Sequence, residues 1–377
     1  MSTWIASTDA TEAAAAGAEL VEGLHEAHGA TLVVFFAHDE LDGVVLGRAL
    51  SAACADAAVL GCSTNGQFSA ASGPARGAVA IAFDGEVVRS AHAALAPLGD
   101  GAQAGVDAAT KALGEAAGAP LRALDPTKWI GLALLDGAKR REEAINEALG
   151  NVAPLLPFVG GSAGDQIQFA STWVVVGDRC AREASALALI EPAGPFTVLK
   201  TCNYVPGERT VKVTKLDPEN PSVFLELDGR PAAEVYAEIC GVEPDALDFA
   251  CFSAQPLGLM IDDAPWLRSP VRTTEGGGVL FACTVVEGTE LAVMERQDLV
   301  ADTERALAAA REELGADPAG ALLFNCAYRM IEAQTTGATD AYHAALKTLP
   351  HAGMHTNGET YLGHINQTLT GLLLGRG

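Results

Sequence analysis

The chain has 377 residues, and 24 Lys+Arg against 48 Asp+Glu give it a formal net charge of −24. Hydrophobic residues make up 49% and charged residues 19%, a composition that excludes a disordered chain and allows buried hydrophobic cores. A chain of this length most simply forms two domains. The acidic balance argues against nucleic acid and a membrane surface as partners, because both are bound by clustered Lys and Arg. The excess of acidic residues is still compatible with a small anionic ligand that is bound by one or two arginines.

The amino terminus lacks the basic region and apolar core of a signal peptide, and no window is long and apolar enough to span a bilayer. Eight cysteines lie mostly in apolar runs and form no CxxC pair. This is not the pattern of a disulfide framework or of a zinc ribbon. We therefore expect a cytoplasmic protein with reduced cysteines and no metal site.

Apolar runs alternate with helical patterns through the first half of the chain. The expected elements, in order, are a helix at 9–30, a strand at 31–37, a helix at 40–56, strands at 58–61, 77–83 and 87–94, a helix at 100–118, a strand at 129–135, a helix at 140–149, and strands at 157–160, 172–176 and 184–190. A proline-rich stretch follows. We expect it to hold a hairpin of 200–204 with 210–216 and to separate two domains, residues 1–200 and 222–377.

The second half starts again with the same kinds of pattern. The expected elements are a helix at 231–240, strands at 269–274 and 278–286, a helix at 298–314, a strand at 321–326, a helix at 338–346 and a strand at 367–374. The fold class that follows is mixed α/β, with mixed sheets covered by helices.

Three strand–helix–strand units end in similar turns rich in Gly and Asn. The turns are Gly61-Cys-Ser-Thr-Asn-Gly66, Gly160-Gly-Ser-Ala-Gly-Asp165 and Gly353-Met-His-Thr-Asn-Gly358. Each unit has the size of a βαβ motif. We interpret them as an internal repeat, two copies in the first domain and one in the second.

The turns also carry most of the candidate ligand-binding side chains. Glycine at a strand end lets a ligand approach the backbone, whose N–H groups can hold an anion or a polar group. The candidates from the turns are Cys62, Ser63, Asn65, Ser162, Asp165, Asn357 and Glu359. None of the turns matches GxGxxG or GxxxxGK[ST], so no nucleotide site is predicted.

Arg268, Arg272 and Arg329 stand out in this acidic chain, and an arginine at a strand end suits a carboxylate. We expect Arg268 or Arg329 to bind the ligand. Ion pairing with one of the many acidic residues is the alternative. Two further alternatives concern chemistry: Cys62 as a nucleophile with a histidine base, and His355 or His364 as an axial ligand of haem.

Several of these segments together resemble the FIST family of bacterial sensory proteins, which pair a FIST N with a FIST C domain. The similar segments are Leu60–Gln67, Val159–Asp165, Trp266–Arg268, Val286–Gly288, Phe324–Arg329, Asn357–Glu359 and Asn366–Thr368. The resemblance implies a sensor of small ligands, with amino acids proposed, that works with signalling proteins. Some similar proteins bind haem, sense nitric oxide and partner a histidine kinase. No established catalytic residues are implied.

The leading hypothesis is a cytoplasmic sensor module of bacterial signal transduction. It binds a small polar ligand such as an amino acid, uses no cofactor and signals to a separate protein such as a histidine kinase. The alternatives are a haem-binding nitric-oxide sensor and a cysteine-dependent hydrolase.

Overall fold

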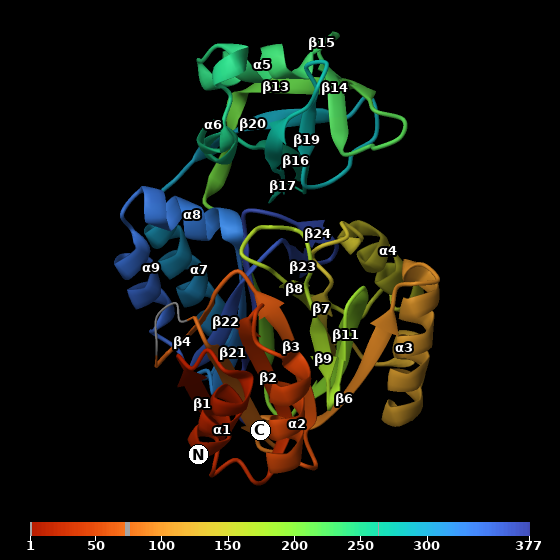
Figure 1. Cartoon of the computed structure of the whole chain (residues 1–377), viewed down its shortest axis with the longest axis vertical. Helices are drawn as coiled ribbons and strands as arrows, with labels where there is room; N and C mark the ends of the chain where they lie inside the picture. The colour runs from red at the N-terminus through yellow and green to blue at the C-terminus, as the bar shows by residue number, and fades with distance from the viewer. Residues whose placement is uncertain (1, 72–75, 263) are drawn as a thin grey trace.

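The computed structural model of the chain describes residues 2–71, 76–262 and 264–377 (Figure 1). Three sheets with helices on their outer faces form a body, and a fourth sheet sits above them at the top of the view. The fourth sheet is built by residues 204–296, which we call the inserted subdomain. Within the described residues no helix is both long and apolar enough to cross a membrane.

The body consists of three units that share a strand–helix–strand–helix–strand core followed by short strands and a returning strand. The first unit contains β1 (Thr3–Thr8), α1 (Ala13–Gly23), β2 (Ala30–His38), α2 (Gly43–Ala53), β3 (Ala58–Thr64), β4 (Gln67–Ser69) and β5 (Ala78–Asp84). The second contains β6 (Val88–Pro97), α3 (Ala102–Ala117), β7 (Ile130–Leu135), α4 (Glu142–Val152), β8 (Phe158–Ser162), β9 (Val174–Val176), β10 (Arg179–Ala181) and β11 (Ala184–Pro192). The third contains β12 (Phe196–Thr201), α7 (Leu299–Leu314), β21 (Gly320–Cys326), α8 (Ala327–Thr335), α9 (Thr339–Leu346), β22 (His351–Thr356), β23 (Glu359–Tyr361), β24 (His364–Ile365) and β25 (Leu369–Leu374).

Strand pairing confirms the predicted repeat. In each unit a central strand pairs in parallel with the strand that follows its helix: β2 with β3, β7 with β8, and β21 with β22. The returning strands β5, β11 and β25 then pair antiparallel with the same central strands. The mixed α/β fold class is therefore confirmed.

The three units also exchange a short strand in a closed ring. After its turn, the first unit gives β4 to the third unit's β22, the second gives β9 to the first unit's β3, and the third gives β23 to the second unit's β8. The exchange draws the three Gly-rich turns together at the centre of the body.

The central strands are buried on both faces because each sheet lies between a shared core and its own helices. Leu32, Val34 and Phe36 of β2 point into the shared core, where they meet side chains of all three units, whereas the alternate residues Val33 and Phe35 pack toward α1 and α2. This two-sided burial explains the continuous apolar runs of the sequence. Each buried aliphatic or aromatic side chain contributes about 1.5–3 kcal/mol.

The inserted subdomain enters between β12 and α7. It contains β13 (Tyr204–Leu216), β14 (Val223–Leu227), β15 (Arg230–Pro231), α5 (Ala232–Cys240), α6 (Phe249–Ala254), β16 (Leu257–Ile261), β17 (Ala264–Arg268), β18 (Pro270–Thr273), β19 (Val279–Phe281) and β20 (Glu290–Arg296), all strand pairs being antiparallel. The predicted hairpin of 200–204 with 210–216 was wrong, because β12 pairs with β25 while β13 belongs to the fourth sheet. The domain boundary at 200–222 stays a prediction.

Polar contacts hold the inserted subdomain against the body. The Glu143 carboxylate on α4 accepts hydrogen bonds from the backbone N–H and hydroxyl of Thr284, at 2.9 and 2.7 Å. On the opposite side, the Tyr328 hydroxyl of α8 donates to the carbonyl of Pro270 at 2.8 Å. The two parts of the chain therefore meet above the ends of the body's strands.

Candidate functional site

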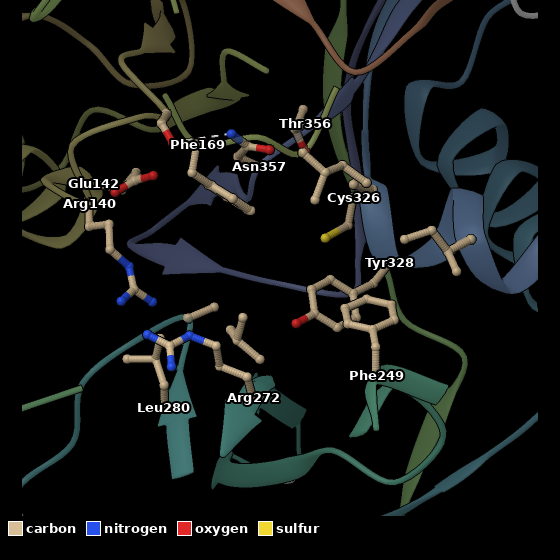
Figure 2. Close-up of a pocket in the computed structure, with 16 residues that line it drawn as sticks. Arg140, Glu142, Phe169, Phe249, Arg272, Leu280, Cys326, Tyr328, Thr356 and Asn357 are labelled. Carbon is tan, nitrogen blue, oxygen red and sulfur yellow. Dashed lines mark hydrogen bonds between the residues drawn. The ribbon is translucent and has the colours of Figure 1, made fainter. Parts of the chain in front are cut away.

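A pocket of about 410 Å³ lies between the inserted subdomain and the body (Figure 2). We call it the interface pocket. The body contributes segments that follow the carboxyl ends of parallel strands, the usual place for ligands in α/β proteins. Its lining consists of Gly137, Arg140, Glu142, Ile167, Phe169, Phe249, Val271, Arg272, Leu280, Ala282, Cys326, Ala327, Tyr328, Ile331, Thr356 and Asn357.

Arg140 is placed by the loop between β7 and α4. At the start of this loop, Oδ1 of Asp136 accepts hydrogen bonds from the Ala138 N–H at 2.9 Å and from the Thr172 hydroxyl at 2.5 Å. Arg140 itself has a left-handed backbone with φ of 53°. Its Nη2 donates to the carbonyl of Phe281 at 2.7 Å, so this guanidinium also links the body to the inserted subdomain.

Arg272 approaches from the inserted subdomain, and the two guanidinium groups lie on the same side of the pocket (Figure 2). Nη1 of Arg272 donates to the carbonyl of Thr273 at 3.3 Å. Among the described residues, neither arginine forms an ion pair. Two guanidiniums that face a cavity without a carboxylate partner can bind an anionic group, since the planar guanidinium matches a carboxylate.

Glu142, at the start of α4, is the acidic residue of the lining. It is 7% exposed, and burial raises the pKa of its carboxyl to about 7. Asp136 and Glu143 raise this pKa further, whereas Arg140 opposes the shift. Near neutral pH, a large share of Glu142 is therefore protonated and uncharged.

Apolar side chains of the loop after β8 form another wall. Asp165 fixes this loop, because its carboxylate accepts hydrogen bonds from the N–H groups of Phe169, Ala170 and Ser171 at 2.6–2.9 Å. Ile167 and Phe169 line the pocket, and both have left-handed backbones, with φ of 63° and 52°. This conformation is unfavourable for bulky residues, so the loop holds these side chains in place against a local cost.

The three Gly-rich turns lie directly behind the pocket and bond to one another. Asn65 donates from Nδ2 to Oδ1 of Asn357 at 2.7 Å, and its Oδ1 accepts from the Ile167 N–H at 2.9 Å. Nδ2 of Asn357 donates to the carbonyl of Gly137 at 3.1 Å. The second turn joins through Ser162, whose carbonyl accepts from the Asn357 N–H at 3.1 Å. We call residues 63–66, 162–165 and 356–359 the turn cluster.

Of the ligand-binding residues predicted from sequence, Asn357 lines the pocket, and Asn65 and Asp165 support residues that do. Ser63 lies deeper, where its hydroxyl accepts the Trp173 N–H at 3.1 Å. The hydroxyl of Ser162 is fully buried and has no hydrogen-bond partner among the described residues. Most of these turn residues therefore hold the residues that line the pocket and do not line it themselves.

Cys62 and Glu359 are fully buried and do not line the pocket. Sγ of Cys62 lies 3.4 Å from Sδ of Met354 in the shared core, and burial raises the pKa of this thiol. A protonated thiol enclosed by the core is not placed to attack a substrate. The Glu359 carboxylate accepts hydrogen bonds from the hydroxyls of Thr356 and Thr368, and burial raises its pKa to about 7.

The structure does not bring the two predicted arginines to the pocket. Arg329 is fully buried on the other side of α8 and donates to Oδ1 of Asn325 at 3.3 Å, Oδ1 of Asn203 at 2.8 Å and the Thr303 hydroxyl at 2.8 Å. Arg268 is half-buried on β17, and its Nη1 donates to the Leu267 carbonyl at 3.2 Å. The sequence analysis named Arg272 as a conspicuous arginine, but it predicted that Arg268 or Arg329 binds the ligand.

Family models match most of the chain. The model of the FIST N domain matches residues 31–230, and that of the FIST C domain matches residues 232–361. The chain belongs to the FIST family. FIST domains are known as small-ligand sensory domains in signal transduction. The junction between the two matches falls within the inserted subdomain. A search among curated proteins found no match.

A haem in this FIST protein would need an axial histidine that opens onto a cavity. His355 is buried against Phe68, with ring centroids 5.0 Å apart, and burial lowers its pKa to about 3. His364 is also buried, with a pKa lowered to about 4. Neither histidine lines the interface pocket. These two residues therefore do not fit a haem in that pocket.

Sequence reasoning missed Arg140, Glu142, Phe169, Phe249 and Tyr328. Arg140 had a usable signal, because Lys139-Arg140-Arg141 is a basic run directly after a strand of an acidic chain. The aromatic residues had none, because they come from three segments that meet only through the docking of the inserted subdomain.

Proposed function

We propose that this FIST protein is a sensor that binds a small organic carboxylate in the interface pocket. The observation that carries the proposal is the pair Arg140 and Arg272, which reach one cavity from the two parts of the chain and form no ion pair within the described residues. A carboxylate there gains two charge-assisted contacts. Amino acids, expected from the sequence, are one class of compound that carries this group.

Signalling follows from the position of the pocket. A ligand that contacts Arg140 on the body and Arg272 on the inserted subdomain stabilises the arrangement in which these two parts are closed on each other. Binding then shifts the population toward that arrangement. A separate output protein, such as a histidine kinase in the bacterial cytoplasm, reads the shift. Cys62 is enclosed by the core, so the geometry does not favour a hydrolase.

The test is isothermal titration with a panel of amino acids and simple carboxylates on the wild type, Arg140→Ala and Arg272→Ala. Each substitution removes a charged hydrogen-bond donor, so we expect the affinity to fall by about ten- to a hundredfold. Arg179→Ala, which removes an exposed arginine of β10, is the matched control and leaves affinity unchanged. Binding that is equally tight in all four proteins contradicts the proposal.

A further inference from the structure

The walls of the interface pocket identify the ligand more closely, and this inference rests on the proposed function. Most of the lining is apolar, and three aromatic rings are part of it: Phe169, Phe249 and Tyr328. The rings of Phe249 and Tyr328 pack against each other, with centroids 4.8 Å apart and planes inclined by 37°. Figure 2 shows this pair on the side of the cavity away from the two guanidiniums.

Phe169 is placed to cover a ligand. It is 45% exposed, which is unusual for a phenylalanine, and its side chain points into the cavity in Figure 2. Asp165 and the left-handed backbone hold it there. An exposed aromatic ring at the mouth of an apolar cavity loses contact with water when an apolar group enters, and this burial favours binding.

The charged end of the pocket disfavours an amino group. Arg140 and Arg272 are both cationic, and Glu142 is the carboxyl group among the lining residues. Burial raises the Glu142 pKa to about 7, so much of the protein lacks a full negative charge there. A ligand ammonium at this end would lie beside two guanidiniums, and these like charges repel it.

We propose that the interface pocket takes a monocarboxylate with a flat apolar body and no amino group. Its carboxylate lies on Arg140 and Arg272, and its ring lies between Phe169 and the Phe249–Tyr328 pair. The volume of about 410 Å³ suits a ligand of this kind, since pockets for small molecules typically measure about 300–1,000 Å³.

The test is isothermal titration with four probes that differ by one group: 3-phenylpropanoate, propanoate, 3-phenylpropan-1-ol and L-phenylalanine. We expect 3-phenylpropanoate to bind at least about tenfold more tightly than each of the others, because they lack the ring, lack the charge or add an ammonium. Phe169→Ala weakens binding of 3-phenylpropanoate severalfold. Leu155→Ala, which removes an exposed leucine outside the pocket, is the matched control and leaves it unchanged.

The outcomes separate this inference from the proposed function. If L-phenylalanine or propanoate binds as tightly as 3-phenylpropanoate, and this binding is lost in Arg140→Ala, the inference is overturned while the carboxylate sensor stands. If no probe and no amino acid binds in a manner that depends on Arg140, both are overturned.

Discussion

The turn cluster and the interface pocket are adjacent but use their polar groups in opposite ways. In the turn cluster, the side-chain amides of Asn65 and Asn357 bond to each other and to the neighbouring backbone. In the pocket, Arg140 and Arg272 contact only backbone carbonyls through the hydrogen bonds that the structure describes for them. Groups saturated by the protein stabilise the fold, whereas groups left without a charged partner are available to a ligand.

The same contrast separates two arginines. Arg329 is enclosed and donates to three neutral side chains, while Arg140 reaches the pocket. Sequence reasoning placed Arg329 in the binding site because it follows the end of a buried strand, and Arg140 also follows one. Position along the chain does not reveal on which face of a helix a side chain falls until the helix and its partners are known.

Removing Arg329 should have the largest effect on stability. Arg329→Ala removes the donor to Oδ1 of Asn203 and to the Thr303 hydroxyl, and one of the two donors to Oδ1 of Asn325, which keeps its bond from the Tyr342 hydroxyl. It also opens a buried space, so we expect a loss of roughly 3–4 kcal/mol in the free energy of unfolding. Urea denaturation measures it. Arg140→Ala is the comparison and should cost less than about 1 kcal/mol. Equal losses in the two variants would contradict the contrast between these arginines.

Glu142 should lower the stability of the protein as the pH rises toward neutrality. Its folded-state pKa of about 7 exceeds the ordinary glutamate value of 4.5, so the folded protein binds this proton more tightly than the unfolded chain does. Stability from this group therefore falls as the pH rises from about 4.5 to 7. We expect Glu142→Gln to raise the free energy of unfolding by about 2–3 kcal/mol at pH 8 and by much less at pH 5.

The control for that prediction is Glu147→Gln, which changes an exposed residue of the same helix. Its stability relative to wild type should not change between pH 5 and pH 8. A Glu142→Gln protein that is destabilised at both pH values would show that the carboxylate is charged and held by Arg140.

His355 should make the protein sensitive to acid. Burial, assisted by His343, lowers its pKa to about 3, so the unfolded chain takes up a proton near pH 6.5 while the folded protein stays neutral. Stability from this group is present above pH 6.5 and is lost as the pH falls toward 3. Between pH 7.5 and pH 5 we expect His355→Gln to lose about 2 kcal/mol less than the wild type.

Exposed His25 provides the matched substitution, and His25→Gln should follow the wild-type pH dependence. Identical pH dependence in the wild type and His355→Gln would mean that His355 is protonated in the folded state.

Much of the body was predictable because its signals are local. A strand buried on both faces gives a continuous apolar run, as in β2, and the Gly-rich turns mark where the second parallel strand of each unit ends. Helix α8 was missed because it buries Arg329 and Glu332, which breaks the apolar periodicity. The exchanged strands β4, β9 and β23 have only three residues each, and they are defined by partners far along the chain. No local pattern reveals such pairing.

The pocket was harder to predict because its residues come from segments that lie far apart in the chain. Asn357 was found because it belongs to a repeated turn, but Phe249 and Arg272 reach the site only when the inserted subdomain docks on the body. The hydrogen bonds that define this docking, such as those of Glu143 with Thr284, join residues that no sequence pattern connects.

Hydrogen exchange with and without the tightest-binding of the four probes locates the ligand, and so shows whether it joins the body to the inserted subdomain. We expect slower amide exchange at 166–171 in the body and at 249–254 and 270–273 in the inserted subdomain, by at least about tenfold at a saturating probe concentration. Exchange at 63–66, in the turn cluster, should not change. Protection confined to segments outside the interface pocket, or to only one of its two sides, would contradict the claim that a ligand joins the body to the inserted subdomain.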